Sequence, residues 1–480
     1  MARANKEKKK KKKHNWQIMF VTYAIVFLFL GMMYYICNYA MNNRQELANN
    51  SYNTRSKILI TQNRRGSIYA NDGTVLAKTV TAEDGKEIRK YPFGNEFSHI
   101  VGFATNGRAG IEAIANYYLI NSNAPLSEKV QDEAEAIKYP GDDVHTTLDV
   151  DLQETAYNAM GIYKGAIVVT NPKTGEILAM VSKPDFDPSQ IDAMWSSLVA
   201  DTSGSSILLN RALQGLYPPG STMKIVTALA YIKEHPDTYN SYNFNCSGSF
   251  KKEDETIHCY HGQNHGAVNF AKSFAKSCNS SFANIGTGLD KEEWSKLCDE
   301  LLFNQELPLS LNYSKSRVTI NSNTETSDVM QVSIGQGTTA VTPMHMNLIT
   351  QAIANDGTLM KPMLINSVTN SQGAVIKSFK PATYKKLISS EEASAMKILM
   401  AGVVEHGTAS KLAGLSYTAA GKTGSAEFNS NEDDSHAWFT GFAPVDNPEI
   451  CVTIIIEGAG SGGDYAVPMA KRIFDAYFGE

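Results

Sequence analysis

The chain has 480 residues, of which 42% are hydrophobic and 19% are charged, so it is neither a disordered protein nor a single small domain. Its formal net charge of −5 is unevenly distributed, because residues 1–13 carry eight Lys or Arg and one Glu and leave −12 on the remainder. An acidic bulk argues against nucleic-acid binding, and six cysteines are too few for a disulfide scaffold.

An uncharged apolar segment follows the basic N-terminus. Residues 18–40 contain no charged side chain and are about as long as the roughly 20 residues that cross a hydrocarbon layer. Trp16 at one end, and Tyr34, Tyr35 and Tyr39 at the other, suit the two membrane interfaces. The segment is longer than the apolar region of a signal peptide, and no small-x-small cleavage site follows it. The rival interpretation, a cleaved signal, is therefore less favoured.

The distribution of lysines also predicts an orientation. By the positive-inside rule, residues 1–16 form a cytoplasmic tail, residues 17–40 form a single-pass anchor, and the chain after Asn42 lies outside the cell.

The next segment, residues 41–144, is expected to be a small module that holds a larger domain away from the membrane. Residues 44–53 are polar and are predicted to form a short helical stalk. Asn71-Asp72-Gly73 stands between two apolar runs, which is typical of a β-hairpin.

The character of the chain changes near His145, and we take residues 145–480 as the second domain. Strands near both of its ends, with helices between them, predict one α/β sheet built from the two ends of the domain. The expected elements are a helix over 146–160, a hairpin over 166–181, helices over 270–302 and 343–354, strands over 437–443 and 450–457, and a helix over 467–478.

A Pro-Pro-Gly turn precedes Ser221 and an apolar run at residues 225–232. If a helix begins here, Ser221 and Lys224 share one face. A neutral lysine placed in this way can take a proton from a serine hydroxyl. The alternative is a helix-capping serine followed by a solvated lysine.

Spacing alone does not choose between these interpretations. Ser-x-x-Lys also occurs at residues 249, 273 and 394, Ser-x-Asn occurs in four places, and Lys-Thr-Gly occurs at both Lys173 and Lys422. The copy at Lys173 lies in an Asn-Pro turn, so we interpret it as structural. Order and context decide: Ser221–Lys224, Ser277–Asn279 and Lys422–Gly424 follow one another as in penicillin-binding proteins and serine β-lactamases.

The chain closely resembles the class B penicillin-binding proteins, from the anchor to the C-terminus. Besides the three motifs, the matching segments are Arg-Gly-Ser-Ile at 65–68, Asn-Asp-Gly at 71–73, Gly-Gln-Gly at 335–337 and Ala-Gly-Lys-Thr-Gly-Ser-Ala-Glu at 420–427. The resemblance implies an α/β transpeptidase domain, with an antiparallel sheet flanked by helices and an all-helical part, on a small elongated pedestal.

The resemblance also implies roles for individual residues. Ser221 would attack the carbonyl of the penultimate D-Ala of a stem peptide, Lys224 would accept its proton, and Ser277 would relay a proton to the leaving amine. Burial and the nearby Lys422 would help to keep Lys224 neutral. Backbone N–H groups of Ser221 and Ser425 would form the oxyanion hole.

The remaining motif residues would bind substrate. Asn279 would hold a substrate backbone amide, while Lys422 and Thr423 would bind the terminal carboxylate. Gly424 would allow the substrate to approach the strand closely. Ser425 stands where many relatives have Thr, and either hydroxyl can bond a carboxylate.

The function implied is a peptidoglycan D,D-transpeptidase that releases D-Ala and is acylated by penicillin and other β-lactams. It needs no cofactor, and its partner would be a multi-pass membrane glycosyltransferase of the shape, elongation, division and sporulation group. The alternatives are a D,D-carboxypeptidase, a β-lactamase or β-lactam sensor, and a catalytically silent scaffold.

Residues 246–265 combine two cysteines with three histidines. Cys246 and Cys259 are candidates for a disulfide, and together with His258, His261 or His265 they are conceivable zinc ligands, although the spacing matches no standard closed motif. We expect free thiols, solvated histidines and no metal.

Overall fold

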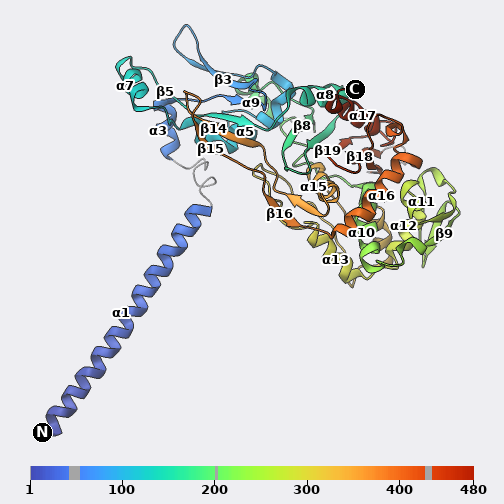
Figure 1. Ribbon diagram of the computed structural model, residues 1–480, viewed down its shortest axis with the longest axis horizontal. Helices are drawn as coiled ribbons and strands as arrows, with labels where there is room; N and C mark the ends of the chain where they lie inside the picture. Colours follow the sequence, from blue (N-terminus) through green and yellow to red (C-terminus); the bar gives the residue numbers. More distant parts are fainter. Residues whose placement is uncertain (1, 43–53, 201–203, 428–434) are drawn as a thin grey trace. The chain divides into compact units, whose positions relative to one another are not determined.

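The computed structural model describes residues 2–42, 54–200, 204–427 and 435–480 (Figure 1). The predicted stalk over residues 44–53 lies outside these described residues. The chain divides into two units, Met1–Gln62 and Asn63–Glu480.

The first unit is helical. Helix α1 (Ala2–Asn42) contains the apolar stretch Asn15–Met41, which has a mean hydropathy of 2.0 and is long enough to cross a membrane. None of the side chains in its most apolar window is buried inside the protein, as expected of a surface that faces lipid. The stretch coincides with the predicted anchor. The helix also includes the basic residues before it, and helix α3 (Thr54–Gln62) closes the unit.

The second unit contains a six-stranded sheet in the order β15-β14-β6-β2-β3-β4. Strands β2 and β3 pair antiparallel across Asn71–Gly73, which confirms the predicted hairpin. Two strands of this sheet, β14 and β15, come from far along the chain and were not predicted; β14 pairs antiparallel with β6. The bounds are β2 Ile68–Tyr69, β3 Val75–Thr81, β4 Glu87–Lys90, β6 Asp143–Thr146, β14 Ile365–Thr369 and β15 Val375–Ser378.

A buried cluster of charges joins this sheet to helix α5 (Gly110–Ile114). The Glu112 carboxylate is fully buried and lies 2.6 Å from the Arg65 guanidinium and 2.7 Å from that of Arg89. Burial alone would raise the pKa of Glu112, but the two guanidinium groups outweigh it and hold this pKa below its usual value. Two positive charges around one carboxylate therefore fix α5 against the sheet.

A five-stranded antiparallel sheet, in the order β17-β18-β19-β7-β8, is built from the two ends of the predicted second domain, as expected. Strands β7 and β19 are apolar and buried along their whole length, since helices cover both faces. Helices α8 and α17 pack on one face, and α15 packs on the other (Figure 1). The bounds are β7 Gly165–Thr170, β8 Ile177–Lys183, β17 Ala420–Glu427, β18 Ser435–Ala443, β19 Ile450–Ile456, α8 Val150–Met160, α15 Pro343–Ala354 and α17 Ala466–Phe478.

Most predicted elements of this region are confirmed, and one helix starts later than expected. The helix expected from residue 146 begins at Val150, because Asp149 caps it by accepting a hydrogen bond from the Leu152 amide, while Thr146 belongs to strand β6. Helix α14 (Thr326–Ser333) ends two residues before the Gly-Gln-Gly segment at 335–337.

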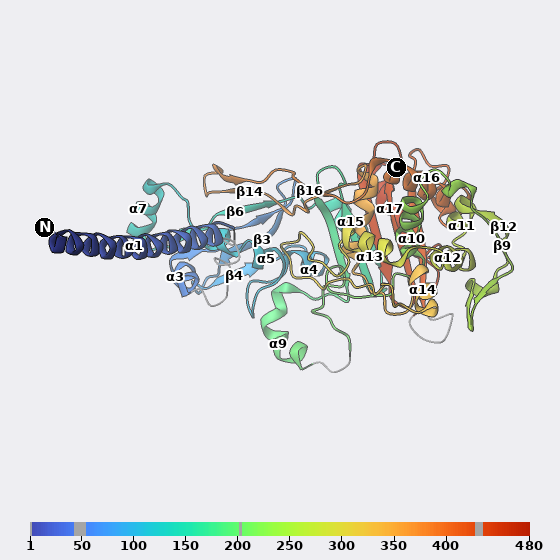
Figure 2. The same ribbon diagram turned by 90° about the horizontal axis from the view of Figure 1, so that it is seen from below.

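The unit also contains a helical region and two small antiparallel strand pairs (Figure 2). Strand β9 pairs with β12, and β10 pairs with β11. The bounds are α10 Lys224–Glu234, α11 Phe270–Ala275, α12 Asn279–Gly286, α13 Lys291–Glu300, α16 Ser390–His406, β9 Asn243–Cys246, β10 Ser249–Lys252, β11 Glu255–His258 and β12 Gly266–Asn269.

Replacement of Glu112 tests the buried charge cluster. We expect Glu112→Gln to lower the free energy of unfolding by about 3–5 kcal/mol, because two buried guanidinium groups lose their counter-ion. Denaturant-induced unfolding measures the change. Glu293→Gln, in an exposed pair with Lys296, is the control and should leave the unfolding midpoint unchanged. Equal stabilities of the two variants would contradict a stabilising role for the buried carboxylate of Glu112.

Candidate active site

Ser221 follows directly on a tight turn that requires glycine. Gly220 has φ +51°, and its amide donates to the Gly335 carbonyl over 2.9 Å. A Cβ at Gly220 would lie 2.8 Å from the Ser425 carbonyl oxygen, so only glycine fits here. The predicted helix does begin at this turn, but its first residues, Gly220–Met223, form a 3-10 turn that leads into α10 at Lys224.

The Lys224 side chain is completely buried and ends among oxygen atoms of both serine motifs. Its Nζ lies 3.0 Å from Ser221 Oγ, 3.2 Å from Ser277 Oγ and 2.6 Å from the Ser277 carbonyl oxygen. Nζ also lies 2.6 Å from Asn279 Oδ1. Burial lowers the pKa of Lys224 to about 8, so a substantial fraction of this amine is neutral near physiological pH.

Lys422 also contacts the hydroxyl group of Ser277. Its Nζ lies 2.8 Å from Ser277 Oγ and donates to the Thr423 carbonyl over 3.0 Å. Burial, and then the charge of Lys224, hold the pKa of Lys422 well below its ordinary value. Ser277, held at φ +56°, therefore places its hydroxyl between two buried amines.

Above the lysines, β17 forms one edge of the five-stranded sheet and one wall of a cleft of about 530 Å³. A Cβ at Gly424 would lie 3.1 Å from the Pro219 carbonyl oxygen, so the strand passes close to the turn before Ser221. On the other wall, Asn279 Nδ2 donates to the His258 carbonyl over 3.0 Å. The cleft can hold an extended peptide against the strand edge.

The structure brings all eight predicted site residues together. Six of them line the cleft and the two lysines lie beneath it; the six are Ser221, Ser277, Asn279, Thr423, Gly424 and Ser425. Two of the rival copies lie elsewhere: Ser394 is exposed on α16, and Lys173 lies in the turn between β7 and β8.

Sequence reasoning missed Thr408, which also lines the cleft and whose hydroxyl contacts that of Thr423. It carries no sequence signal, because the contact depends on α16 packing against β17.

Comparison with known proteins identifies the family. The profile described as the penicillin binding protein transpeptidase domain matches residues 165–475, and that of the penicillin binding protein A dimerisation domain matches residues 65–144. The chain belongs to the class B penicillin-binding proteins. The peptidoglycan D,D-transpeptidase PbpA of Mycolicibacterium smegmatis is 30% identical over 444 residues, which cover 86% of this chain and 89% of that protein.

Solved structures of this family share the fold. The D,D-transpeptidase domain of a peptidoglycan glycosyltransferase from Eggerthella lenta has a TM-score of 0.77 at 29% identity, covering 87% of this chain and 99% of that one. The penicillin G acyl-enzyme complex of penicillin-binding protein A from M. tuberculosis also has a TM-score of 0.77, at 26% identity, covering 87% of this chain and 100% of that one.

The turn before Ser221 can be tested with a pair of glycine variants. Gly414 has φ +72° and open space around its Cβ position, so Gly414→Ala measures the cost of a left-handed alanine alone, about 1–2 kcal/mol. We expect Gly220→Ala to lose more stability than this, because its Cβ also collides with the β17 backbone. Thermal denaturation of the two variants measures the difference, and equal losses would show that β17 does not pack tightly on the turn.

Proposed function

We propose that this protein is a peptidoglycan D,D-transpeptidase whose nucleophile is Ser221. The observation that carries the proposal is the position of Lys224 Nζ, which is buried, 3.0 Å from Ser221 Oγ and in contact with Ser277. A serine hydroxyl needs a neighbouring base, and an amine whose pKa is about 8 supplies one.

The chemical steps follow from this geometry. Ser221 Oγ bonds to the carbonyl carbon of the penultimate D-Ala while its proton passes to neutral Lys224. The tetrahedral intermediate collapses as the C–N bond breaks, and the leaving D-Ala takes a proton through the Ser277 hydroxyl, which contacts both lysines. The amine of a second stem peptide then attacks the carbonyl carbon of the acyl-enzyme. As the ester C–O bond breaks, a proton from this amine passes through Lys224 to Ser221 Oγ, and the new amide bond is the cross-link.

The wall of the cleft supplies the binding groups. Lys422, Thr423 and Ser425 would bind the terminal carboxylate, and Asn279 would bind a substrate amide. Gly424 leaves room for the peptide beside the strand. Backbone N–H groups of Ser221 and Ser425 would stabilise the oxyanion, where the loss of one donor typically costs about 10²–10³ in rate. A β-lactam would acylate Ser221 by the same attack, and the acyl-enzyme complex of the M. tuberculosis relative supports this extension.

The placement of the protein at the membrane is part of the proposal. Residues 1–16 would be cytoplasmic, residues 17–40 would cross the membrane, residues 41–144 would form the pedestal, and residues 145–480 would work on the outer side. The basic N-terminus and the apolar helix support this orientation. A multi-pass membrane glycosyltransferase would supply the glycan strands.

The partner can be tested by co-purification. We expect a tagged full-length chain to retain such a glycosyltransferase through its anchor and pedestal, and a chain that lacks residues 17–140 to lose it. Retention by the shortened chain would contradict this contact.

Fluorescent penicillin tests the nucleophile. We expect the wild type to be labelled covalently and Ser221→Ala to show no labelling, because the attacking oxygen is gone. Ser394→Ala is the matched control: it removes an exposed serine of another Ser-x-x-Lys pair and should be labelled like the wild type. Equal labelling of Ser221→Ala and the wild type, resolved by gel electrophoresis, would overturn the proposal.

The pH dependence of acylation tests the role of Lys224. Only the neutral amine can accept the proton, so the acylation rate should rise about tenfold between pH 6 and pH 7 and level off above pH 9. The charged and titratable groups facing the amine are Lys422, Cys259 and Cys278. Stopped-flow measurement with penicillin G gives the profile. A rate that is constant from pH 6 to pH 9 would exclude Lys224 as the base.

A further inference from the structure

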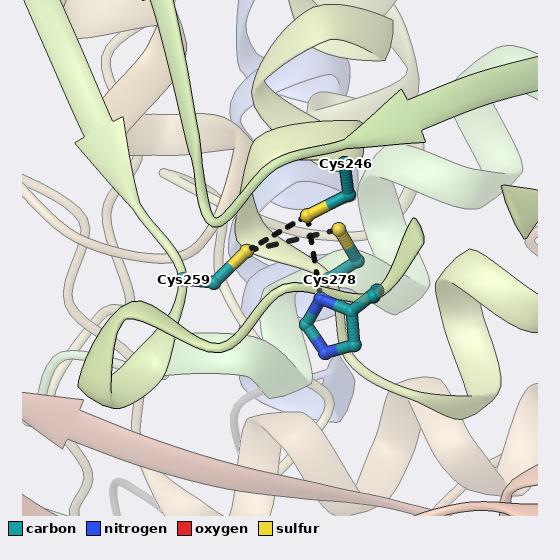
Figure 3. A group of neighbouring side chains, drawn as sticks. Cys246, Cys259 and Cys278 are labelled. Carbon is teal, nitrogen blue, oxygen red and sulfur yellow. Dashed lines mark hydrogen bonds between the residues drawn. The ribbon is translucent and has the colours of Figure 1, made fainter. Parts of the chain in front are cut away.

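Three thiols and one imidazole converge beside the active site. Cys246 ends strand β9, Cys259 follows β11, His265 precedes β12, and Cys278 caps the N-terminus of α12. The three cysteines are buried free thiols, and Figure 3 shows their sulfur atoms pointing toward one another from separate segments. One donor atom from each of the four residues lies within 4.8 Å of the other three.

Three of the distances between these donor atoms match those of a tetrahedral zinc site. With Zn–S bonds of about 2.3 Å, two sulfur ligands at the tetrahedral angle lie about 3.8 Å apart, and a sulfur and an imidazole nitrogen lie about 3.6 Å apart. The observed separations are 3.6 Å from Cys246 Sγ to Cys259 Sγ and 3.8 Å from Cys259 Sγ to Cys278 Sγ. Cys246 Sγ lies 3.5 Å from His265 Nδ1.

We propose that Cys246, Cys259, His265 and Cys278 bind one Zn²⁺ ion in a closed, structural Cys₃His site. Soft thiolates with one imidazole are the donor set that selects zinc over magnesium or calcium. This assigns a metal where the sequence alone led us to expect none. The ligands come from four segments at no standard spacing, and the fourth lies inside the Ser-x-Asn motif.

The surroundings of the sulfur atoms suit metal-bound thiolates. The Gly248 amide donates to Cys246 Sγ over 3.4 Å, and the Ser281 amide donates to Cys278 Sγ over 3.4 Å. The Ser280 hydroxyl lies 3.1 Å from Cys259 Sγ. Hydrogen bonds of this kind hold metal ligands in position and stabilise their negative charge.

A disulfide accounts for less of the geometry. It would join Cys246 to Cys259 with sulfur atoms about 2.05 Å apart and leave Cys278 and His265 without a reason to converge on the same point. A purely apolar cluster of thiols does not explain why an imidazole nitrogen faces Cys246 Sγ.

The zinc site would hold in place the loop of residues 277–279, and the catalytic role of this loop rests on the proposed function. Cys278 lies between Ser277 and Asn279, both of which contact Lys224 Nζ. Ser277 is held at φ +56°, a backbone conformation that is costly for any residue other than glycine. A metal bound through Cys278 would tie this loop to both small strand pairs, β9–β12 and β10–β11, and hold Ser277 at the lysines.

Metal analysis of the full-length protein in detergent, after dialysis against metal-free buffer, tests the site. We expect about one zinc per chain by mass spectrometry. After exchange into Co²⁺ we expect intense thiolate-to-cobalt absorption and visible bands of tetrahedral cobalt. Cys278→Ser keeps an oxygen to cap α12 but should lose the metal and these bands, as should His265→Ala. Cys298→Ser and Cys451→Ser remove buried thiols elsewhere and should keep both.

Two results would overturn the proposal. One is wild-type protein that takes up neither zinc nor cobalt and shows a Cys246–Cys259 disulfide by peptide mapping. The other is metal binding that survives in both Cys278→Ser and His265→Ala. Because these readouts are metal content and disulfide mapping, they do not depend on activity, and Ser221→Ala should bind zinc like the wild type.

The positioning role has its own test. We expect chelation of the metal to slow penicillin acylation by on the order of a hundredfold, a typical loss for a misplacement of about 1 Å, and added Zn²⁺ to restore the rate. An unchanged rate in metal-free protein would contradict positioning.

Discussion

The structure depends on one constraint: two buried lysine side chains must end at the same serine hydroxyl. Lys224 and Lys422 are both fully buried, and both contact Ser277 Oγ. Removing two ammonium groups from water is costly, and that cost lowers the pKa of each amine. The protein therefore needs three segments in fixed positions: the start of α10, the Ser277 loop and strand β17.

The rest of the fold secures these segments. Trp438 on β18 donates its indole N–H to the Pro218 carbonyl over 3.1 Å, which ties the turn before Ser221 to the sheet. The Tyr217 hydroxyl donates to Glu457 Oε1 over 2.7 Å, and Arg211 pairs with the same carboxylate. The zinc site we propose would act on the third segment, the loop that carries Ser277.

Residue patterns led to the residues that the structure brings together around the cleft, since each motif is short and local. Ser221 with Lys224, Ser277 with Asn279, and the strand from Lys422 to Ser425 could be recognised within a few residues each. The hairpin at Asn71–Gly73 was predictable for the same reason. Patterns could not predict partners distant in sequence: nothing in residues 365–378 indicates that they pair with β6 rather than with the five-stranded sheet. Cys278 was not predicted as a metal ligand, because its neighbours Cys246, Cys259 and His265 come from three other segments.

Mapping the site of penicillin attachment tests the central claim, that the buried lysines activate Ser221, most directly. The full-length protein and Lys224→Ala would be treated with penicillin G, digested, and analysed by mass spectrometry for the acylated peptide. We predict one adduct, on Ser221, in the wild type and none in Lys224→Ala within the same time. An adduct on another serine, or equally rapid acylation of Ser221 in Lys224→Ala, would contradict it.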